Sequence, residues 1–348
     1  MFGFSVFLNE DLSHETKDYI GKMAQAGFSG IFTSLHIPED DATRYRERLS
    51  QLGHLAKQYE LELMVDISGA ALQRAGFSFE QIDELQAIGV TGLRMDDQIA
   101  NHTIARLSKM ITVALNASTI GEQDIEDLKA ADANFQQLEA WHNYYPRPET
   151  GLDRQWYLEK NRWLKQYGFS IQAFVPGDAG LRGPIFAGLP TLEEHRHGSP
   201  LAAVLDLQAT TDRIYIGDSR LSAKSIAQFT SYIKEQIIVL EAQGYDDQFK
   251  YVLGDHTNRL DEARDVLRSA TARFKEIPEI VPLAACVREV GSITIDNQRY
   301  LRYMGEIQVV KRDLPMDDRV NVVGRVCPSD RPLLQQIHAG QKFRIESE

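Results

Sequence analysis

The sequence predicts a parallel (β/α)8 barrel followed by a smaller, mostly antiparallel β domain. Over about the first 240 residues, short apolar runs alternate with segments of helical periodicity, and eight such units fit a closed barrel. The turn after the first run, Leu8 to Asp11, lacks the glycines that a doubly wound sheet usually carries there. Beyond about residue 245, short strand-like runs are separated by turn residues. We therefore expect domains at residues 1–243 and 244–348.

The barrel strands are expected at the apolar runs 2–8, 30–36, 61–67, 92–96, 110–116, 135–142, 170–175 and 213–217. Local signals mark the helices between them. Ser13 is a candidate N-cap for a helix that Gly27 ends, and Ser78 opens a capping-box sequence. In the second domain we expect a helix at 259–268 and strands at 293–295, 300–304, 306–310 and 320–326.

Composition and charge limit the partners. The chain has 348 residues, of which 43% are hydrophobic and 25% charged, as in an ordinary globular protein. The net charge of −12 argues against nucleic acid or an anionic membrane surface, because both require a basic field. The apolar start at Met1 lacks the basic leader and the length of a signal peptide, and no run approaches eighteen apolar residues. These features indicate a cytoplasmic protein. Whether the chain forms a homodimer is left open by the sequence.

Two aspartates end neighbouring strands of the predicted barrel. The active site of such a barrel lies at the carboxyl ends of its strands, where Asp66 and Asp96 end the third and fourth. Two carboxylates in one pocket tend to divide into a proton donor and an ionised base or nucleophile, which is what a glycosidase needs. Alternatively, each aspartate caps the following helix or pairs with Arg94.

A variant mechanism uses the adjacent Asp97. If both Asp96 and Asp97 face the pocket, a 2-acetamido sugar could supply its own nucleophile, with one aspartate orienting the amide and the other acting as acid. We expect Asp97 to face the helix layer instead, because successive side chains of a strand point to opposite sides.

Two loops at the same predicted mouth are rich in polar groups. The segment His142 to Leu152 carries Asn143, the flat ring of Tyr145, and Arg147, which suits a carboxylate or phosphate. The alternative is a rigid turn with surface aromatics. Asn116 and Asp218 add further hydrogen-bonding groups at strand ends.

The second loop, Phe174 to His197, is unusually long for a compact domain, which favours a functional role. Arg182, His195 and Arg196 concentrate positive charge and proton-transfer groups there. Glu193 is a further candidate, but it lies three residues before Arg196 and could instead form an intrahelical ion pair with it.

As a set, the motifs resemble the bacterial 6-phospho-N-acetylmuramidases of the MupG type. The residues that carry the resemblance are Gly92-x-Arg94-x-Asp96, Asn116-x-Ser118, His142 to Arg147, Thr150 to Leu152, Arg182 to Pro184, Gly188 to Arg196, His256 to Ser269 and Asp317 to Gly324. The resemblance covers essentially the whole chain. The first strand departs from it, because the family often has Ser-x-Tyr-Pro where this chain has Ser5 to Leu8.

The resemblance implies a barrel followed by a cyclophilin-like β-barrel domain. It also implies a cytoplasmic glycosidase that cleaves N-acetylmuramic acid 6-phosphate from its β-1,4 link to N-acetylglucosamine in cell-wall recycling. The resemblance does not identify the catalytic carboxylates, so Asp66 and Asp96 are expected to be catalytic from their positions at strand ends, and Asn116 and Asn143 to order the acetamido or hydroxyl groups. The residues expected to bind the rest of the anionic sugar are Arg94, Tyr145, Arg147, Arg182, Glu193, His195, Arg196 and Asp218.

This chemistry needs no cofactor and no metal, because a proton donor and a carboxylate suffice for glycosidic cleavage. Two alternatives remain. A barrel lyase or aldolase acting on a sugar phosphate would need a lysine or a metal site at a strand end, and none of the eight predicted strands ends in lysine. A non-catalytic phosphosugar-binding protein would bind the same ligand without turnover.

Overall fold

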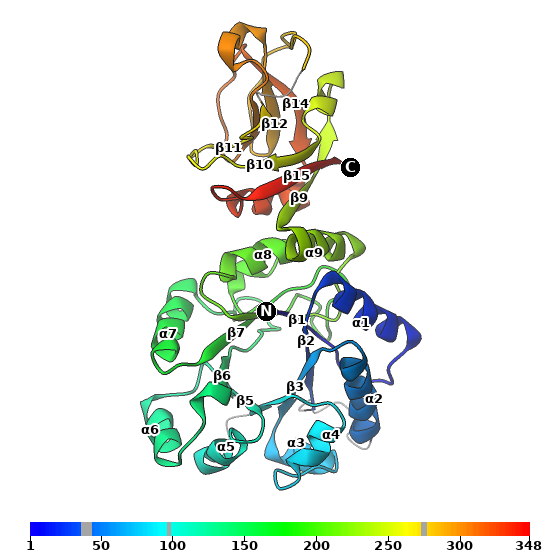
Figure 1. Ribbon diagram of the computed structural model, residues 1–348, viewed down its shortest axis with the longest axis vertical. Coiled ribbons are helices and arrows are strands. Elements are labelled where there is room, and N and C mark those ends of the chain that lie inside the picture. The colour runs from blue at the N-terminus through cyan, green and yellow to red at the C-terminus, as the bar shows by residue number, and fades with distance from the viewer. Residues whose placement is uncertain (36–43, 96–98, 273–276) are drawn as a thin grey trace. The chain divides into compact units, whose positions relative to one another are not determined.

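The computed structural model describes residues 1–35, 44–95, 99–272 and 277–348, and these form two compact units (Figure 1). The first is Met1–Ile226 and the second is Ala227–Glu348. This division falls earlier in the chain than the expected boundary at residues 243 and 244. None of the helices in the described ranges has both the length and the apolar character needed to cross a bilayer.

Eight parallel strands close into a barrel in the first unit, as the sequence predicts. Every strand pairs with its neighbour in chain order, and β8 returns to β1 with Ile214 opposite Phe2. The strands are β1 (Phe2–Ser5), β2 (Gly30–Ser34), β3 (Glu62–Ile67), β4 (Gly92–Met95), β5 (Thr112–Asn116), β6 (Leu138–Trp141), β7 (Ser170–Val175) and β8 (Arg213–Ile216).

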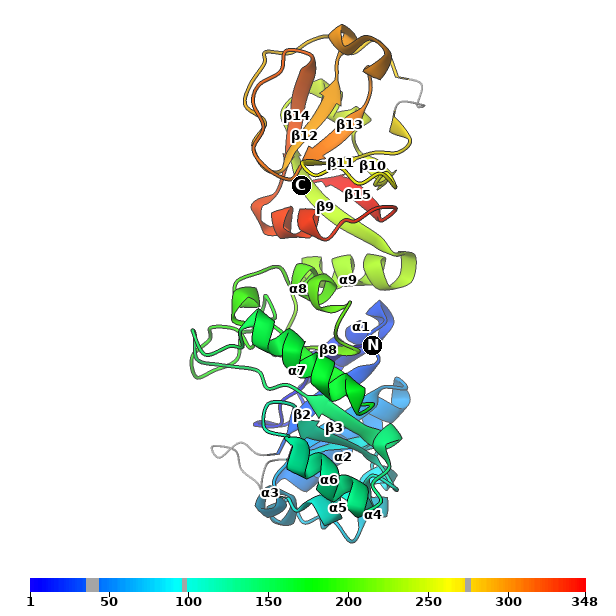
Figure 2. The ribbon, with the colours of Figure 1, turned by 90° about the vertical axis from the view of Figure 1, so that its left-hand side faces the viewer.

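Helices surround the strands as an outer layer (Figures 1 and 2). They are α1 (His14–Ala26), α2 (Tyr45–Gln58), α3 (Gly69–Arg74), α4 (Ile82–Ala87), α5 (Asn101–Leu107), α6 (Glu122–Ala130), α7 (Arg154–Gln166) and α8 (Pro200–Leu207). A further helix, α9 (Ala223–Glu235), begins in the first unit and continues into the second. The predicted caps of α1 are present. The Ser13 hydroxyl accepts the backbone N–H of Thr16, and Gly27 ends the helix with φ of 103°, a left-handed value that favours glycine.

An apolar cluster fills the middle of the barrel. Its buried members are Phe32, Met64, Ala114, Trp141, Phe174 and Tyr215. The rings of Phe32 and Phe174 lie 5.1 Å apart, and those of Trp141 and Tyr215 lie 4.9 Å apart. Gly3 leaves room for this packing, because a Cβ there would lie 2.2 Å from the Tyr215 ring. Along each strand that contributes to this cluster, the next inward-facing residue toward the carboxyl end therefore lies at the floor of the barrel mouth.

A separate ion-pair cluster lies at the opposite, amino-terminal end of the barrel. Arg213 at the start of β8 pairs with Glu139 of β6 at 2.8 Å and with Glu62 of β3 at 2.6 Å. The Trp141 indole N–H also donates to Glu139 at 2.6 Å. Burial raises the pKa of Glu139, and Arg213 partly offsets that effect. Charged side chains thus occupy both ends of the barrel, with the apolar cluster between them.

The second unit is built on a seven-stranded sheet in the order β10-β15-β9-β14-β12-β13-β11. Its strands are β9 (Ile237–Gly244), β10 (Gly254–Thr257), β11 (Val266–Arg268), β12 (Ser292–Asp296), β13 (Ile307–Val310), β14 (Val320–Val326) and β15 (Lys342–Ser347). All neighbours are antiparallel except β9 and β15. Strand β9, which the sequence analysis placed with the barrel, belongs to this sheet. A specifically cyclophilin-like arrangement remains a prediction.

Two secondary-structure predictions in the second unit are wrong. The helix expected at 259–268 is absent, because Val266 and Leu267 pair with β13 as part of β11. The strand expected at 300–304 is part of a short 3-10 helix, Gln298–Tyr303, which Asn297 caps by accepting the backbone N–H of Arg299. In both places, pairing or capping by neighbouring groups outweighs a weak local pattern.

Candidate active site

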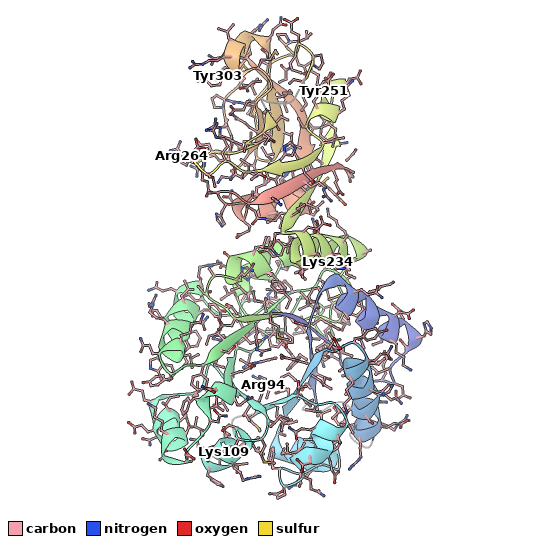
Figure 3. The ribbon with its side chains drawn as sticks, viewed as in Figure 1. Arg94, Lys109, Lys234, Tyr251, Arg264 and Tyr303 are labelled. Carbon is pink, nitrogen blue, oxygen red and sulfur yellow. The ribbon has the colours of Figure 1, made fainter. Side chains whose placement is uncertain are left out.

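A cavity of about 350 Å3 opens at the carboxyl ends of the barrel strands, where the sequence predicts the site. Its lining residues are Phe32, Ser34, Asp66, Arg94, Asn143, Tyr144, Tyr145 and Phe174. Figure 3 shows Arg94 within the ring of strands. The cavity combines an aromatic floor with a few convergent polar groups, which is the usual composition of a small-molecule site.

Among the described residues that line this cavity, Asp66 supplies the carboxylate. It follows Met64 by two residues on β3, so it shares the inward face one step closer to the mouth. One carboxylate oxygen accepts a hydrogen bond from Nη1 of Arg94 at 2.6 Å, and the other accepts one from Oγ of Ser34 at 2.8 Å. The Asp66 side chain is 14% exposed and that of Arg94 is 10% exposed. Because both carboxylate oxygens of Asp66 accept hydrogen bonds from the protein, the side chain is held as a hydrogen-bond acceptor.

Arg94 connects Asp66 to the loop after β6. Its Nη2 donates to Oδ1 of Asn143. Because Arg94 can only donate, this contact fixes the amide orientation and leaves the Nδ2 hydrogens of Asn143 for another acceptor. The backbone carbonyl of Asn143 accepts a hydrogen bond from Oγ1 of Thr191 at 2.9 Å, which holds this loop against the loop after β7. The amide is therefore held in place before any ligand binds.

Tyr144 and Arg182 form one side of the mouth. The Tyr144 ring packs edge-on against Phe174, with centroids 5.1 Å apart, and burial raises the pKa of its hydroxyl. Nη1 of Arg182 donates to that hydroxyl at 3.3 Å, and its guanidinium lies 3.5 Å from the centre of the Phe7 ring. No carboxylate in the described part of the chain forms an ion pair with Arg182. Its charge is thus not neutralised by any carboxylate among the described residues.

Family models match this chain over nearly its whole length. The amino-terminal model of 6-phospho-N-acetylmuramidase matches residues 2–231, and the carboxyl-terminal model matches residues 236–346. The chain belongs to the 6-phospho-N-acetylmuramidase family. The family name denotes a glycosidase, which is consistent with an acidic group beside amide and guanidinium groups in one cavity.

Two solved structures resemble the chain over its full length. A conserved protein of unknown function from Enterococcus faecalis is 50% identical, with a TM-score of 0.94 and coverage of 100% of this chain and 96% of that one. An uncharacterized protein from B. cereus is 24% identical, with a TM-score of 0.76 and 99% coverage of both chains, and this likeness shows the fold alone. No curated protein matches the chain.

In this member of the 6-phospho-N-acetylmuramidase family, Glu193 and Arg196 hold two loops together. Nε of Arg196 donates to Oε1 of Glu193 at 2.6 Å, and Nη2 donates to Oε2 at 2.5 Å. Glu193 also accepts the backbone N–H groups of Glu149 and Gly151, each at 2.7 Å. The hydrogen bonds from Arg196, with those from the backbone, lower the pKa of Glu193 to about 2. The intrahelical pair weighed from the sequence is therefore present.

The charge of Arg196 is neutralised by contacts within the protein. Besides Glu193, it donates to the backbone carbonyls of Arg147, Ala187 and Gly188, and its side chain is only 2% exposed. The Arg147 side chain itself, on the loop after β6, is exposed. Of the four cationic candidates from the two loops, Arg147 is exposed and Arg182 borders the cavity through Tyr144, whereas the charge of Arg196 is not accessible.

His195 lies in a different cluster. Its Nε2 is 2.8 Å from Oδ2 of Asp206, and Arg154 forms ion pairs with both Asp206 and Glu194. The ligand atoms of Glu194, His195 and Asp206 lie within 4.8 Å of one another, a spacing that a metal ion could use. The Arg154 guanidinium already binds both carboxylates, so a cation there would face an existing positive charge. We regard the cluster as structural.

Asp218 holds the long loop after β7 through hydrogen bonds to the loop backbone. Its carboxylate is fully buried and accepts the backbone N–H groups of Gly177, Leu189 and Arg182 at 2.9, 3.0 and 3.0 Å. These three donors are up to twelve residues apart in sequence, from Gly177 to Leu189. Asp218 therefore shapes the backbone that presents Arg182, and its oxygens are already occupied by the protein.

Asn116 opens onto a second cavity. Its Oδ1 accepts the backbone N–H of Ser118 at 3.0 Å, and the residue lines a hollow of about 250 Å3 beside α5 and α6. Among the described residues, that hollow and the cavity of Asp66 have no lining residue in common. Asp96 and Asp97 lie outside the described residues.

The sequence analysis did not select Ser34 or Tyr144, although both line the cavity. A signal existed for Ser34, because it ends the strand before that of Asp66 and pairs with it in register. Tyr144 could not be separated from Tyr145 by sequence, since loop residues follow no fixed alternation.

Proposed function

We propose that the chain hydrolyses the β-1,4 bond between N-acetylmuramic acid 6-phosphate and N-acetylglucosamine, in the cytoplasm, as a step of peptidoglycan recycling. The observation that carries the proposal is the network Ser34–Asp66–Arg94–Asn143, which fixes a carboxylate and an amide on one wall of the cavity. The family to which the chain belongs supports the phosphorylated amino sugar as substrate.

Asp66 serves as the ionised partner of the reaction. Because Ser34 and Arg94 both donate to it, it is poised to accept a proton from water, or to attack or stabilise the anomeric carbon. The second carboxylate is Asp96, proposed from its position at the end of the fourth strand in the sequence. Asp96 donates a proton to the leaving oxygen as the C1–O bond breaks. Water then supplies hydroxide to C1 and its remaining proton to the basic carboxylate.

The anionic groups of the sugar are held by the accessible cations. Arg182 and Arg147 receive the 6-phosphate and the lactyl carboxylate, since a guanidinium matches both groups. The Nδ2 hydrogens of Asn143 meet the acetamido carbonyl, and the Tyr145 ring lies along the sugar. Clustering of these groups at one mouth accounts for anion binding by a protein with a net charge of −12.

Incubation with the phosphorylated and the unphosphorylated disaccharide tests the proposal. We expect release of N-acetylglucosamine from the phosphorylated compound only, with oxygen-18 from labelled water at C1 of the muramic acid 6-phosphate. Release without label would indicate elimination by a lyase. Binding of the phosphorylated disaccharide without turnover would indicate a phosphosugar-binding protein, and equal cleavage of both compounds would contradict the role of the phosphate.

A further inference from the structure

The loop after β7 exposes two large apolar side chains close to the cavity. Ile185 is 47% exposed and Phe186 is 64% exposed. Phe186 also has a φ of 56°, in the left-handed region that bulky residues rarely adopt. Neither the exposed ring nor this backbone conformation is favourable for folding, and such outliers gather at ligand-binding sites. A contact made by the ring itself would explain why a phenylalanine occupies this position.

The tip that carries Phe186 is joined to the cavity wall. The backbone N–H of Phe186 donates to the carbonyl of Arg182 at 3.2 Å, which closes a turn over residues 182–186. The backbone N–H of Arg182 donates to the Asp218 carboxylate, and the Arg182 side chain donates to the Tyr144 hydroxyl at 3.3 Å. The Phe186 ring lies against Gly183, where a Cβ would come within 3.0 Å of it. The position of the ring is therefore set by the residues that border the mouth.

We propose that Phe186, with Ile185 beside it, forms the platform on which the leaving-group sugar stacks. The inference rests on the proposed function and identifies where the aglycone binds. The cavity around Asp66 holds the polar groups for the phosphorylated sugar, so the second ring must extend from the mouth. An aromatic face beyond the rim suits the apolar face of an amino sugar, which carries no charge that would require Arg182 or Arg147.

Two substrates with the same phosphorylated sugar test the platform. One is the disaccharide, and the other is the 6-phospho-N-acetylmuramyl fluoride, whose leaving group is a single atom. For Phe186→Ala we expect kcat/KM to fall about tenfold on the disaccharide, the size of a lost aromatic contact, and to change less than about twofold on the fluoride. Phe186→Trp should keep the activity on both substrates.

Matched variants separate stacking from folding and from assembly. Phe186→Gly removes the ring but accepts a positive φ, so we expect its Tm to equal or exceed that of the wild type while disaccharide cleavage falls. Met110→Ala changes another exposed apolar residue, 44% exposed and just before β5 at the opposite end of the barrel, and should change neither substrate.

Four outcomes would overturn the assignment. An equal loss on both substrates, or no loss on the disaccharide, would refute the platform while leaving the proposed function intact. Dissociation of a wild-type dimer by Phe186→Ala, seen by light scattering, would show that the ring contacts a second copy of the chain. Failure of the wild type to cleave either substrate would refute the proposed function and this inference together.

Discussion

Replacement of Asp66 by asparagine is the most direct test of the cavity as a catalytic centre. Asparagine keeps the shape of the side chain and can still accept one hydrogen bond from Arg94, while the Ser34 hydroxyl can reverse to accept from the new amide. The charge is lost, however, and so is the ability to take a proton. We expect kcat for the phosphorylated disaccharide to fall by about 10²- to 10⁴-fold, the usual contribution of such a group, with only a small change in KM.

The same substitution should also weaken the fold. Asp66 and Arg94 are 14% and 10% exposed, so Asp66→Asn leaves a largely buried guanidinium without its counter-charge. Breaking a buried pair costs about 3 kcal/mol or more. In a unit of this size, that loss lowers Tm by about 6–12 °C. The expected phenotype is therefore a folded but less stable protein with almost no turnover.

Glu139→Gln provides a matched control. Glu139 is also a buried carboxylate paired with an arginine, Arg213 at 2.8 Å, but it lies at the amino-terminal end of the barrel. We expect a loss of Tm without a loss of kcat at temperatures where both variants are folded. Thermal unfolding followed by circular dichroism, and release of N-acetylglucosamine, are the two measurements. The reasoning would be refuted if Asp66→Asn kept more than about a tenth of the wild-type kcat. It would also be refuted if kcat of Glu139→Gln fell as far as we expect for Asp66→Asn.

Three further predictions follow from the same site. Asp96→Asn should abolish cleavage of the phosphodisaccharide while its binding, measured by calorimetry, persists; Asp97→Asn is the control and should stay active, and loss of cleavage in both variants would favour the mechanism in which the acetamido group assists, because that mechanism uses both aspartates. Arg182→Met should raise KM for the phosphorylated disaccharide about tenfold or more with a smaller effect on kcat, and an unchanged KM would remove Arg182 from anion binding. The folded-state pKa of Glu193 is lowered to about 2, so its contribution to stability is complete above the unfolded pKa and is lost as pH falls toward 2. The free energy of unfolding of Glu193→Gln, measured in urea, should therefore depend less on pH in that window than that of the wild type. Parallel curves of unfolding free energy against pH for the two proteins would contradict this.

The sequence was sufficient to predict the barrel and the level at which its site lies. Strand periodicity is a local property, and the alternation of side chains places Asp66 and Arg94 inward at the carboxyl ends once the strands are located. The helix expected at 259–268 failed because Val266 and Leu267 form a sheet with a strand about forty residues later in the chain. Local periodicity contains no information about such a distant partner.

The sequence alone determined that charged and amide side chains follow the carboxyl ends of the barrel strands. The tertiary structure decided which of those groups remain available to a ligand. Arg196 is neutralised by Glu193 and by backbone carbonyls, and Asp218 already accepts backbone N–H groups, whereas within the described residues the Arg182 side chain contacts a hydroxyl and an aromatic ring. The physical reason is that hydrogen bonds and ion pairs depend on distances of a few ångströms between loops, and those distances exist only after the barrel has closed.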